Sequence, residues 1–190
     1  MAKLGPAHYS PYPVAVYEGV LNPPQGKALL FDKVVDKETA MREAAKAMLT
    51  RENPTIFVGP LVLYAWNEDA EKKAKLVKEM AEVLNARIIP MYDYRPKYPK
   101  VDPEVEINPN HPNLTIWQNN IKACIFIGVH DHYASVALKI IRCETDCFTI
   151  SLDTPSGHED AMITIRSTDV EDLEKFIEIA KEVKKELGLA

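Results

Sequence analysis

The sequence predicts an α/β fold of three layers, with helices on both faces of a doubly wound, mostly parallel sheet. Two stretches favour this fold. Each begins with a short apolar run rich in β-branched residues, at 54–58 and 123–127, and each run ends at a glycine, Gly59 or Gly128. Such runs are typical of strands covered on both faces. A segment of helical period and then a second β-rich run follow each glycine, which is the order of a right-handed crossover between parallel strands.

Capping residues and prolines mark the elements of the first half. Asp36 is a residue of the N-cap type, with Glu38 in the turn that follows, and Pro54 stops the helix that begins there. Glu68 places negative charge at the start of the next helix, where the helix dipole favours it. The elements expected in this half are a helix over 36–49, a strand over 54–59, a helix over 67–85 and a strand over 87–91.

The second half repeats this alternation. Thr168 and Glu171 have the spacing of a capping box, in which two side chains satisfy backbone N–H groups at the start of the last helix. The expected elements are a short helix or turn of strand at 114–121, strands over 123–127 and 148–152 around a helix over 133–141, a strand over 161–166 and a helix over 170–187.

Two segments rich in proline and tyrosine lie outside this pattern. Residues 1–35 are expected to form an extended arm ahead of a single α/β domain over 36–190, because five prolines between residues 5 and 26 resist helix formation. The arm is either a strap over its own domain or a segment that docks on another subunit. Residues 92–113 also hold five prolines and predict either a covering loop or a partner-binding surface.

The composition excludes several classes of protein. A chain of 190 residues with 46% hydrophobic and 27% charged residues suits one domain with a sizeable core. A net charge of −5 without a basic cluster argues against a nucleic-acid partner. No apolar run approaches the roughly 20 residues needed to cross a bilayer, and residues 1–10 lack the apolar core of a secretion signal. We therefore expect a cytoplasmic protein with no membrane partner.

The turns that follow the two buried strands are the candidate site, since ligands of open parallel sheets bind near the carboxyl ends of the strands. Neither turn contains GxGxxG or GxxxxGK[ST], and the chain has seven glycines in all. Dinucleotide and triphosphate sites use several close glycines so that backbone N–H groups can approach phosphate, which disfavours a usual nucleotide site. A nucleotide bound edge-on by a modified turn would touch Gly59, Pro60, Leu61, Gly128, Val129 and His130.

Metal and catalytic sites are weakly supported. His130, Asp131 and His132 follow the second buried strand, and His158 lies in a later loop, so they could supply metal ligands or a general base. Zinc needs three or four convergent ligands, which an HxH pair and one distant histidine do not provide. The three cysteines are too few for an iron–sulfur cage and are expected as reduced thiols. We expect no catalytic residue and no metal on this chain.

Three segments resemble the carbon monoxide dehydrogenase beta-subunit family, which includes the epsilon subunit of the acetyl-CoA decarbonylase/synthase complex. They are PTIFVGPLVL from Pro54, KACIFIGVHDHY from Lys122 and FTISLD from Phe148, of which the strand followed by Gly128, His130 and Tyr133 is the most distinctive. The similarity extends from Asp36 to the C-terminus. It implies a Rossmann-like domain similar to those that hold NAD or FAD, and a non-catalytic accessory subunit bound to the nickel–iron subunit that oxidises CO. A role in flavin-linked electron transfer would make FAD the possible cofactor.

Two hypotheses of different classes follow. The first is an accessory, epsilon-like subunit of an anaerobic oxidoreductase complex, with the other subunits of that complex as partners. The resemblance implies carbon monoxide dehydrogenase/acetyl-CoA synthase as the host, or alternatively a pyruvate or other 2-oxoacid:ferredoxin oxidoreductase, which a similar small subunit accompanies. The second is an autonomous protein that binds FAD or NAD at the two turns. The glycine-poor turns favour the first hypothesis and thus a hetero-oligomer.

Overall fold

The computed structural model describes residues 23–24, 26–63, 68–91, 106–154, 158, 160–166 and 169–189. Seven strands in this part of the chain form one sheet. The strands are β1 (Lys27–Leu30), β2 (Lys33–Asp36), β3 (Thr55–Val58), β4 (Arg87–Pro90), β5 (Ala123–Ile127), β6 (Phe148–Thr154) and β7 (Ile163–Arg166). The helices are α2 (Lys37–Thr50), α3 (Pro60–Leu63), α4 (Glu68–Leu84), α5 (Pro112–Gln118), α6 (Asp131–Glu144) and α7 (Val170–Glu186).

The strand order is β2-β1-β7-β6-β5-β3-β4, and the sheet is mostly parallel. All pairs among β3 to β7 are parallel, whereas β1 pairs antiparallel with β2 and with β7. Every residue of β3 and β5 is buried, as expected for central strands covered on both faces. The predicted α/β fold class is confirmed.

The chain leaves the two central strands in opposite directions. From β3 it continues through α4 to β4 at one edge, and from β5 it continues through α6 to β6 toward the other edge. The boundary between β3 and β5 is therefore the switch point of a doubly wound sheet, where ligands of such sheets usually bind. Gly59 and Gly128 directly follow these strands, so both predicted turns lie at the switch point.

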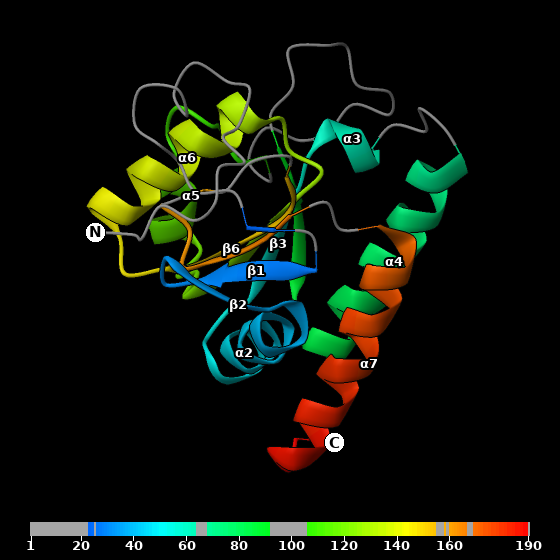
Figure 1. Cartoon of the computed structure of the whole chain (residues 1–190). Helices are drawn as coiled ribbons and strands as arrows, with labels where there is room; N and C mark the ends of the chain where they lie inside the picture. Colours follow the sequence, from blue (N-terminus) through cyan, green and yellow to red (C-terminus); the bar gives the residue numbers. More distant parts are fainter. Residues whose placement is uncertain are drawn as a thin grey trace.

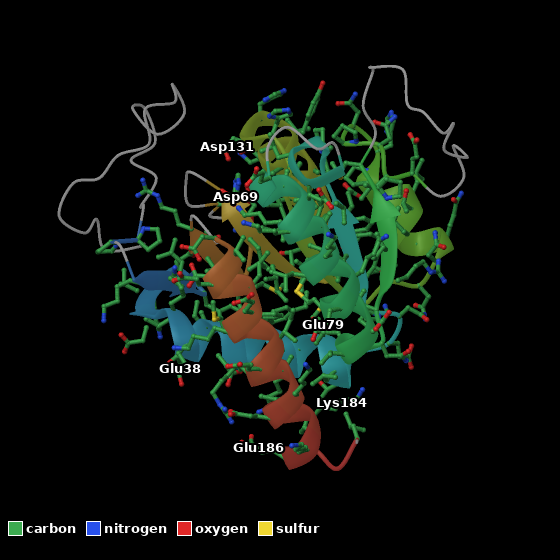
Figure 2. The ribbon with its side chains drawn as sticks, turned by 90° about the vertical axis from the view of Figure 1, so that its right-hand side faces the viewer. Glu38, Asp69, Glu79, Asp131, Lys184 and Glu186 are labelled. Atoms are coloured by element: carbon green, nitrogen blue, oxygen red, sulfur yellow. The ribbon has the colours of Figure 1, made fainter. Side chains whose placement is uncertain are left out.

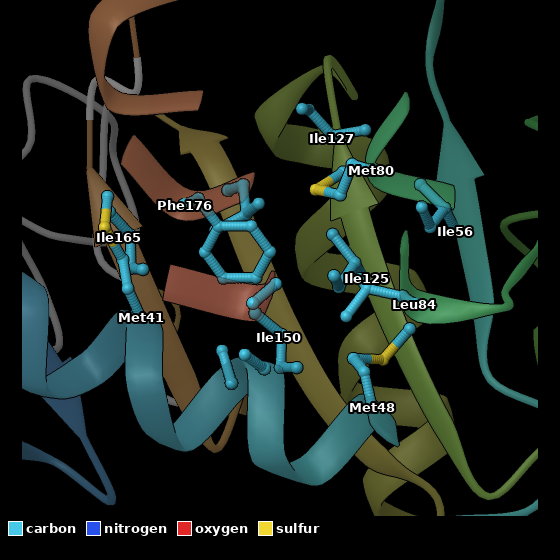
Figure 3. Packing of buried hydrophobic residues seen from close by; sticks show 14 of the residues in the cluster. Met41, Met48, Ile56, Met80, Leu84, Ile125, Ile127, Ile150, Ile165 and Phe176 are labelled. Atoms are coloured by element: carbon cyan, nitrogen blue, oxygen red, sulfur yellow. The ribbon is translucent and has the colours of Figure 1, made fainter. Parts of the chain in front are cut away.

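Two hydrophobic cores separate the three layers. Figure 1 shows α4 and α7 side by side, and α7 also packs against α2. On this α2/α4/α7 face, Met48, Met80 and Phe176 pack against the sheet residues Ile125 and Ile150 (Figure 3). On the opposite α5/α6 face, the sheet contributes larger rings, and the ring centroids of Phe57 and Phe126 lie 5.2 Å apart. We refer to the two faces as the α2/α4/α7 face and the α5/α6 face.

The N-terminal part of the sheet is a β-hairpin that the sequence analysis did not predict. Residues 27–35, assigned there to the extended arm, form β1 and most of β2, so the sheet begins before the predicted boundary at Asp36. Phe31 and Asp32 connect the strands with φ of 46° and 61°. A type I′ turn needs positive φ at both positions, but Phe-Asp lacks the usual Asn-Gly signal. The rest of the arm lies outside the described residues.

The segment over 92–113 is also more regular than expected. Its first part, 92–105, lies outside the described residues. Ile107 is fully buried and forms a parallel bridge with Met91, which extends the sheet beside β4. α5 then begins at Pro112, where the missing N–H costs nothing because the first turn of a helix leaves its donors unpaired. The predicted irregular segment therefore ends before Asn113. Of the two alternatives expected at 114–121, a short helix or a turn of strand, the structure has the helix, α5.

The start of α7 differs from the prediction by one residue. The N-cap is Asp169, whose carboxylate accepts a hydrogen bond from the Asp172 N–H at 2.9 Å, and not the predicted Thr168, which lies outside the described residues. The misplacement is understandable, since Thr and Asp are both strong N-cap residues and stand next to each other. Within the described part of the chain, every helix is too short or too polar to cross a membrane.

The N-cap of α7 can be tested by mutation. Asp169→Ala should lower the free energy of unfolding by about 1 kcal/mol, because the Asp172 N–H loses its acceptor. Asp169→Asn should lose much less, since its amide oxygen can accept the same bond. Urea unfolding of both variants measures the difference, and equal losses would show that Asp169 does not act as a cap.

Candidate functional site

The residues predicted to touch a nucleotide lie in two turns that contact each other. Gly59, Pro60, Gly128 and Val129 are buried, His130 is half-buried and Leu61 is 38% exposed. Val58 and Ile127 are paired in the parallel register of β3 and β5, so the turns leave the sheet side by side. The prediction that the two glycines face each other at the switch point is confirmed.

Backbone hydrogen bonds join these turns. The Gly59 N–H donates to the last carbonyl of β5 at 2.8 Å, and the Leu61 N–H donates to the Gly128 carbonyl at 3.0 Å. Pro60, between them, has no N–H. The Val62 N–H donates to the Gly59 carbonyl at 3.1 Å. Each N–H from Gly59 to Val62, all of them described residues, thus has an acceptor within the protein.

Steric contact also brings the turns together. A Cβ added to Gly59 would lie 2.2 Å from the Gly128 carbonyl oxygen, which no real side chain tolerates. A Cβ added to Gly128 would lie 2.5 Å from Cγ2 of Val62, and the φ of Gly128 is +64°. Glycine is therefore required at both positions by close packing, and at Gly128 also by its left-handed backbone. We call this arrangement the Gly59/Gly128 contact.

These turns do not fit the phosphate of FAD or NAD in the way that doubly wound sheets usually hold it. Such sites present free backbone N–H groups at the start of the helix that follows the first strand. Here the corresponding helix is α3, which spans only Pro60–Leu63 and begins with a residue that has no N–H. The turn after β3 therefore offers a nucleotide phosphate no free backbone N–H group between Gly59 and Val62.

The turn after β5 continues into an aromatic surface at the start of α6. This helix begins at Asp131, earlier than the predicted Tyr133. The rings of His130 and His132 are stacked with centroids 5.8 Å apart, and the ring of Tyr133 lies 4.2 Å from that of His132. Among the described residues, no three His, Cys, Asp or Glu side chains are grouped so that they could hold a metal ion. The His130/His132 pair thus lacks a third ligand there.

His158 is buried against the first turns of α6. Its Nδ1 lies 3.3 Å from Oγ of Ser135, and its Nε2 lies 3.8 Å from Oδ1 of Asp131. The His158 side chain is only 4% exposed, and among the described residues its Nε2 has no hydrogen-bond partner. A serine, a histidine and an aspartate thus come together, but the Nε2 to Oδ1 distance exceeds that of a hydrogen bond. We assign this group a structural role.

The structural role follows from an unusually short connection. Parallel neighbours usually need a crossover of about a dozen or more residues, often a helix, yet only residues 155–162 separate β6 from β7. An irregular connection cannot satisfy its own backbone groups as a helix does. Buried hydroxyls on the α5/α6 face compensate: Oγ1 of Thr164 donates to the His158 carbonyl at 3.3 Å, and Oγ1 of Thr149 donates to the Asp160 carbonyl at 3.4 Å.

From the sequence, His158 was expected to approach residues 130–132 as a metal ligand or general base. It does lie beside Asp131, but its structural role was not predicted. Ser135 and Arg142 were not singled out, although both hold the connection to α6: Arg142 pairs with Asp160 at 2.7 Å. One sequence signal was available. Two predicted parallel strands with too few residues between them for a helix require side chains that fix the loop. The buried polar residues Thr149 and Thr164 in those strands are such side chains.

Two of the three cysteines are buried thiols, as expected. Sγ of Cys124 and Sγ of Cys147 lie 3.7 Å apart in the core of the α5/α6 face, and Cys143 is exposed on α6. Burial raises the pKa of the Cys124 thiol well above its usual value. The neutral thiol is a poor nucleophile, so this pair acts as small core side chains.

The family model described as CO dehydrogenase beta subunit/acetyl-CoA synthase epsilon subunit matches residues 18–183. The match includes both turns at the switch point, the start of α6 and the connection that holds His158. It also begins ahead of Asp36, where the resemblance seen in the sequence begins. A comparison with curated proteins found no match.

Acidification should destabilise the fold through His158. Burial lowers the pKa of His158 below its ordinary value of 6.5, although the Asp131 and Asp160 carboxylates favour the charged form. Below about pH 6.5 the unfolded state therefore binds more protons than the folded state. The free energy of unfolding should be highest above this pH and should fall as the pH drops through the folded-state pKa.

Urea unfolding between about pH 8 and about pH 5 tests this dependence. His158→Gln should remove part of the fall, whereas His132→Gln should keep the wild-type slope because His132 is exposed and outside the connection. If the slope of His158→Gln equals that of the wild type, His158 does not titrate in the way described.

Proposed function

The chain belongs to the CO dehydrogenase beta subunit/acetyl-CoA synthase epsilon subunit family, and from this premise we propose that it is a non-catalytic accessory subunit of a carbon monoxide dehydrogenase/acetyl-CoA synthase complex. The observation that supports this most strongly is the family match over 18–183, which covers most of the chain. The description of the family names subunits, so partners are expected. The metal chemistry would then belong to those partners.

The distribution of ligands supports a non-catalytic role. The described residues offer no group of three metal-binding side chains, and the N–H groups of the turn after β3 are used within the protein. The histidine nearest to a serine and an aspartate is buried and holds a connection between strands. The buried His158 thus has a structural explanation in the described part of the chain.

The two outer surfaces of the domain differ in charge. Charged residues make up 24 of the 48 residues of α2, α4 and α7, but only 4 of the 21 residues of α5 and α6. On the charged surface, ion pairs join α2 and α4 to α7. Figure 2 labels the three glutamates of these pairs, Glu38, Glu79 and Glu186. Their partners are Lys175 at 2.8 Å, Lys181 at 2.8 Å and Arg42 at 2.6 Å, respectively. A surface with so many charged side chains is readily solvated.

The α5/α6 surface has the composition of a protein interface. Leu114 and Trp117 are 47% and 52% exposed and lie three residues apart on α5, so they share one side of that helix. Arg142 of α6 forms an ion pair with Asp160, so its charge is compensated within the chain. Interface cores are depleted in charge and enriched in aromatic residues. We therefore infer that a larger subunit of the complex docks here with an uncharged, apolar patch.

Docking can be tested with the double variant Leu114→Ser, Trp117→Ser. Truncating an interface tryptophan commonly costs about 2 kcal/mol, so the affinity for the host subunits should fall roughly 30-fold or more. The melting temperature should stay close to that of the wild type, because both side chains are exposed. Co-purification with the complex and a binding titration measure the effect.

A matched control is Leu189→Ser, since Leu189 is 50% exposed beyond the end of α7. It should bind like the wild type. If the double variant also binds like the wild type, the docking surface lies elsewhere. If the chain instead co-purifies with a 2-oxoacid:ferredoxin oxidoreductase, the host in the proposal is wrong although the accessory role is kept.

The non-catalytic role has its own test. The isolated chain should retain less than about half an equivalent of iron, nickel or zinc, because a tight site for these metals needs three or four ligands. Metal analysis of protein purified without a tag measures this, with the complete complex as the control that retains metal. Stoichiometric metal in the isolated chain would contradict the proposal.

A further inference from the structure

We propose that the Gly59/Gly128 contact occupies the position where other doubly wound sheets hold a dinucleotide phosphate, so that neither FAD nor NAD places a phosphate on the turn after β3 of this chain. The resemblance implies the opposite, because similar domains hold NAD or FAD in other proteins. The proposal concerns the isolated chain and does not depend on which complex the chain joins.

The backbone N–H groups of the turn after β3 are already hydrogen-bonded within the protein. A phosphate at a switch point accepts hydrogen bonds from backbone N–H groups that point away from the sheet. In the turn after β3, Gly59 and Leu61 donate to the turn after β5 at 2.8 and 3.0 Å, and Val62 donates within its own turn at 3.1 Å. Pro60 has no N–H to donate. To bind a phosphate, the turn would have to break bonds that already satisfy it.

The space between the two turns is also too small for a phosphate group. Between the turns, not even a methyl group fits, because a Cβ on Gly59 would lie 2.2 Å from the Gly128 oxygen and 2.5 Å from Cα of Val129. A phosphate group is larger than a methyl group and negatively charged. It would also approach the Gly128 carbonyl oxygen, whose partial negative charge repels it. Shape and charge therefore both exclude the phosphate from this contact.

The presence of the two glycines, Gly59 and Gly128, can be explained without any bound ligand. In dinucleotide sites, glycines let the backbone approach the pyrophosphate. Here they let one turn approach the other, because Gly59 faces a carbonyl group and Gly128 faces Val62. This explains how a glycine can end both central strands although neither turn has the further glycines of a nucleotide motif. The glycine positions are thus required for packing.

Amide hydrogen exchange on the unmodified chain is the primary test. The N–H groups of Gly59, Leu61 and Val62 should exchange slowly, like those of the β3/β5 ladder, and millimolar FAD, NAD or NADP should leave their rates unchanged. Binding of a nucleotide that leaves these rates unchanged would place its site elsewhere and would support the inference. Fast exchange that slows when FAD or NAD is added would overturn it.

Glycine variants give an independent measurement. Gly128→Ala should lower the melting temperature by roughly 5 °C or more, because it adds both a strained φ and a steric clash. Gly188→Ala is the matched control: its φ is +67°, but nothing lies within 4 Å of an added Cβ, so its loss should be clearly smaller. Gly59→Ala tests the clash without positive φ and should also melt lower.

The outcomes separate packing from binding. If Gly59→Ala and Gly128→Ala melt like Gly188→Ala while the wild type binds FAD and the variants do not, the glycines serve a ligand and the inference is wrong. If the two variants are too unstable to purify, the exchange rates of the wild type with and without nucleotide still decide the question. Both measurements use the isolated chain, so a failure of docking to the complex would not affect them.

Discussion

The contact between the turns that follow β3 and β5 is the constraint on which the centre of the molecule depends. Both strands are fully buried, and the chain leaves them toward opposite faces of the sheet. Their ends must therefore satisfy backbone groups without water, and they do so by hydrogen bonds to each other. This is possible only where two backbones approach very closely, which explains Gly59 and Gly128. The same contact uses the N–H groups of the turn after β3 that a phosphate would otherwise accept bonds from.

The helical layers on the two faces of the sheet differ in the charge of their outer surfaces. The α2/α4/α7 layer combines a large apolar core with an outer surface of interhelical ion pairs, each of which adds little stability but keeps the surface compatible with water. The α5/α6 layer has few charges and exposes Leu114 and Trp117. A subunit that functions by association needs such a difference, because one side must stay solvated while another loses its water. The proposed accessory role explains why the two outer surfaces differ in charge.

The connection from β6 to β7 and the N-terminal hairpin show how local interactions replace missing secondary structure. Where a helix would normally connect β6 to β7, residues 155–162 form a connection whose carbonyl groups accept bonds from Thr149 and Thr164. Its buried His158 contacts Ser135 of α6, and burial lowers the pKa of this histidine. At the other end of the chain, the hairpin of β1 and β2 closes the sheet with a Phe-Asp turn. Both features use polar or strained residues where a standard element is absent.

The sequence by itself determined the α/β class, the central strands and helices, and the pairing of Gly59 with Gly128, because period, length and strand-ending glycines are local signals. It also placed the chain in its family through short motifs. Only the tertiary structure decided that residues 27–35 join the sheet, that Ile107 extends it, and that His158 contacts Ser135. The hairpin of β1 and β2 follows a proline-rich stretch and turns through Phe-Asp in place of Asn-Gly, so the sequence carries no hairpin signal there. Likewise, the role of a glycine is set by what faces it, and that neighbour lies about 70 residues away in the chain.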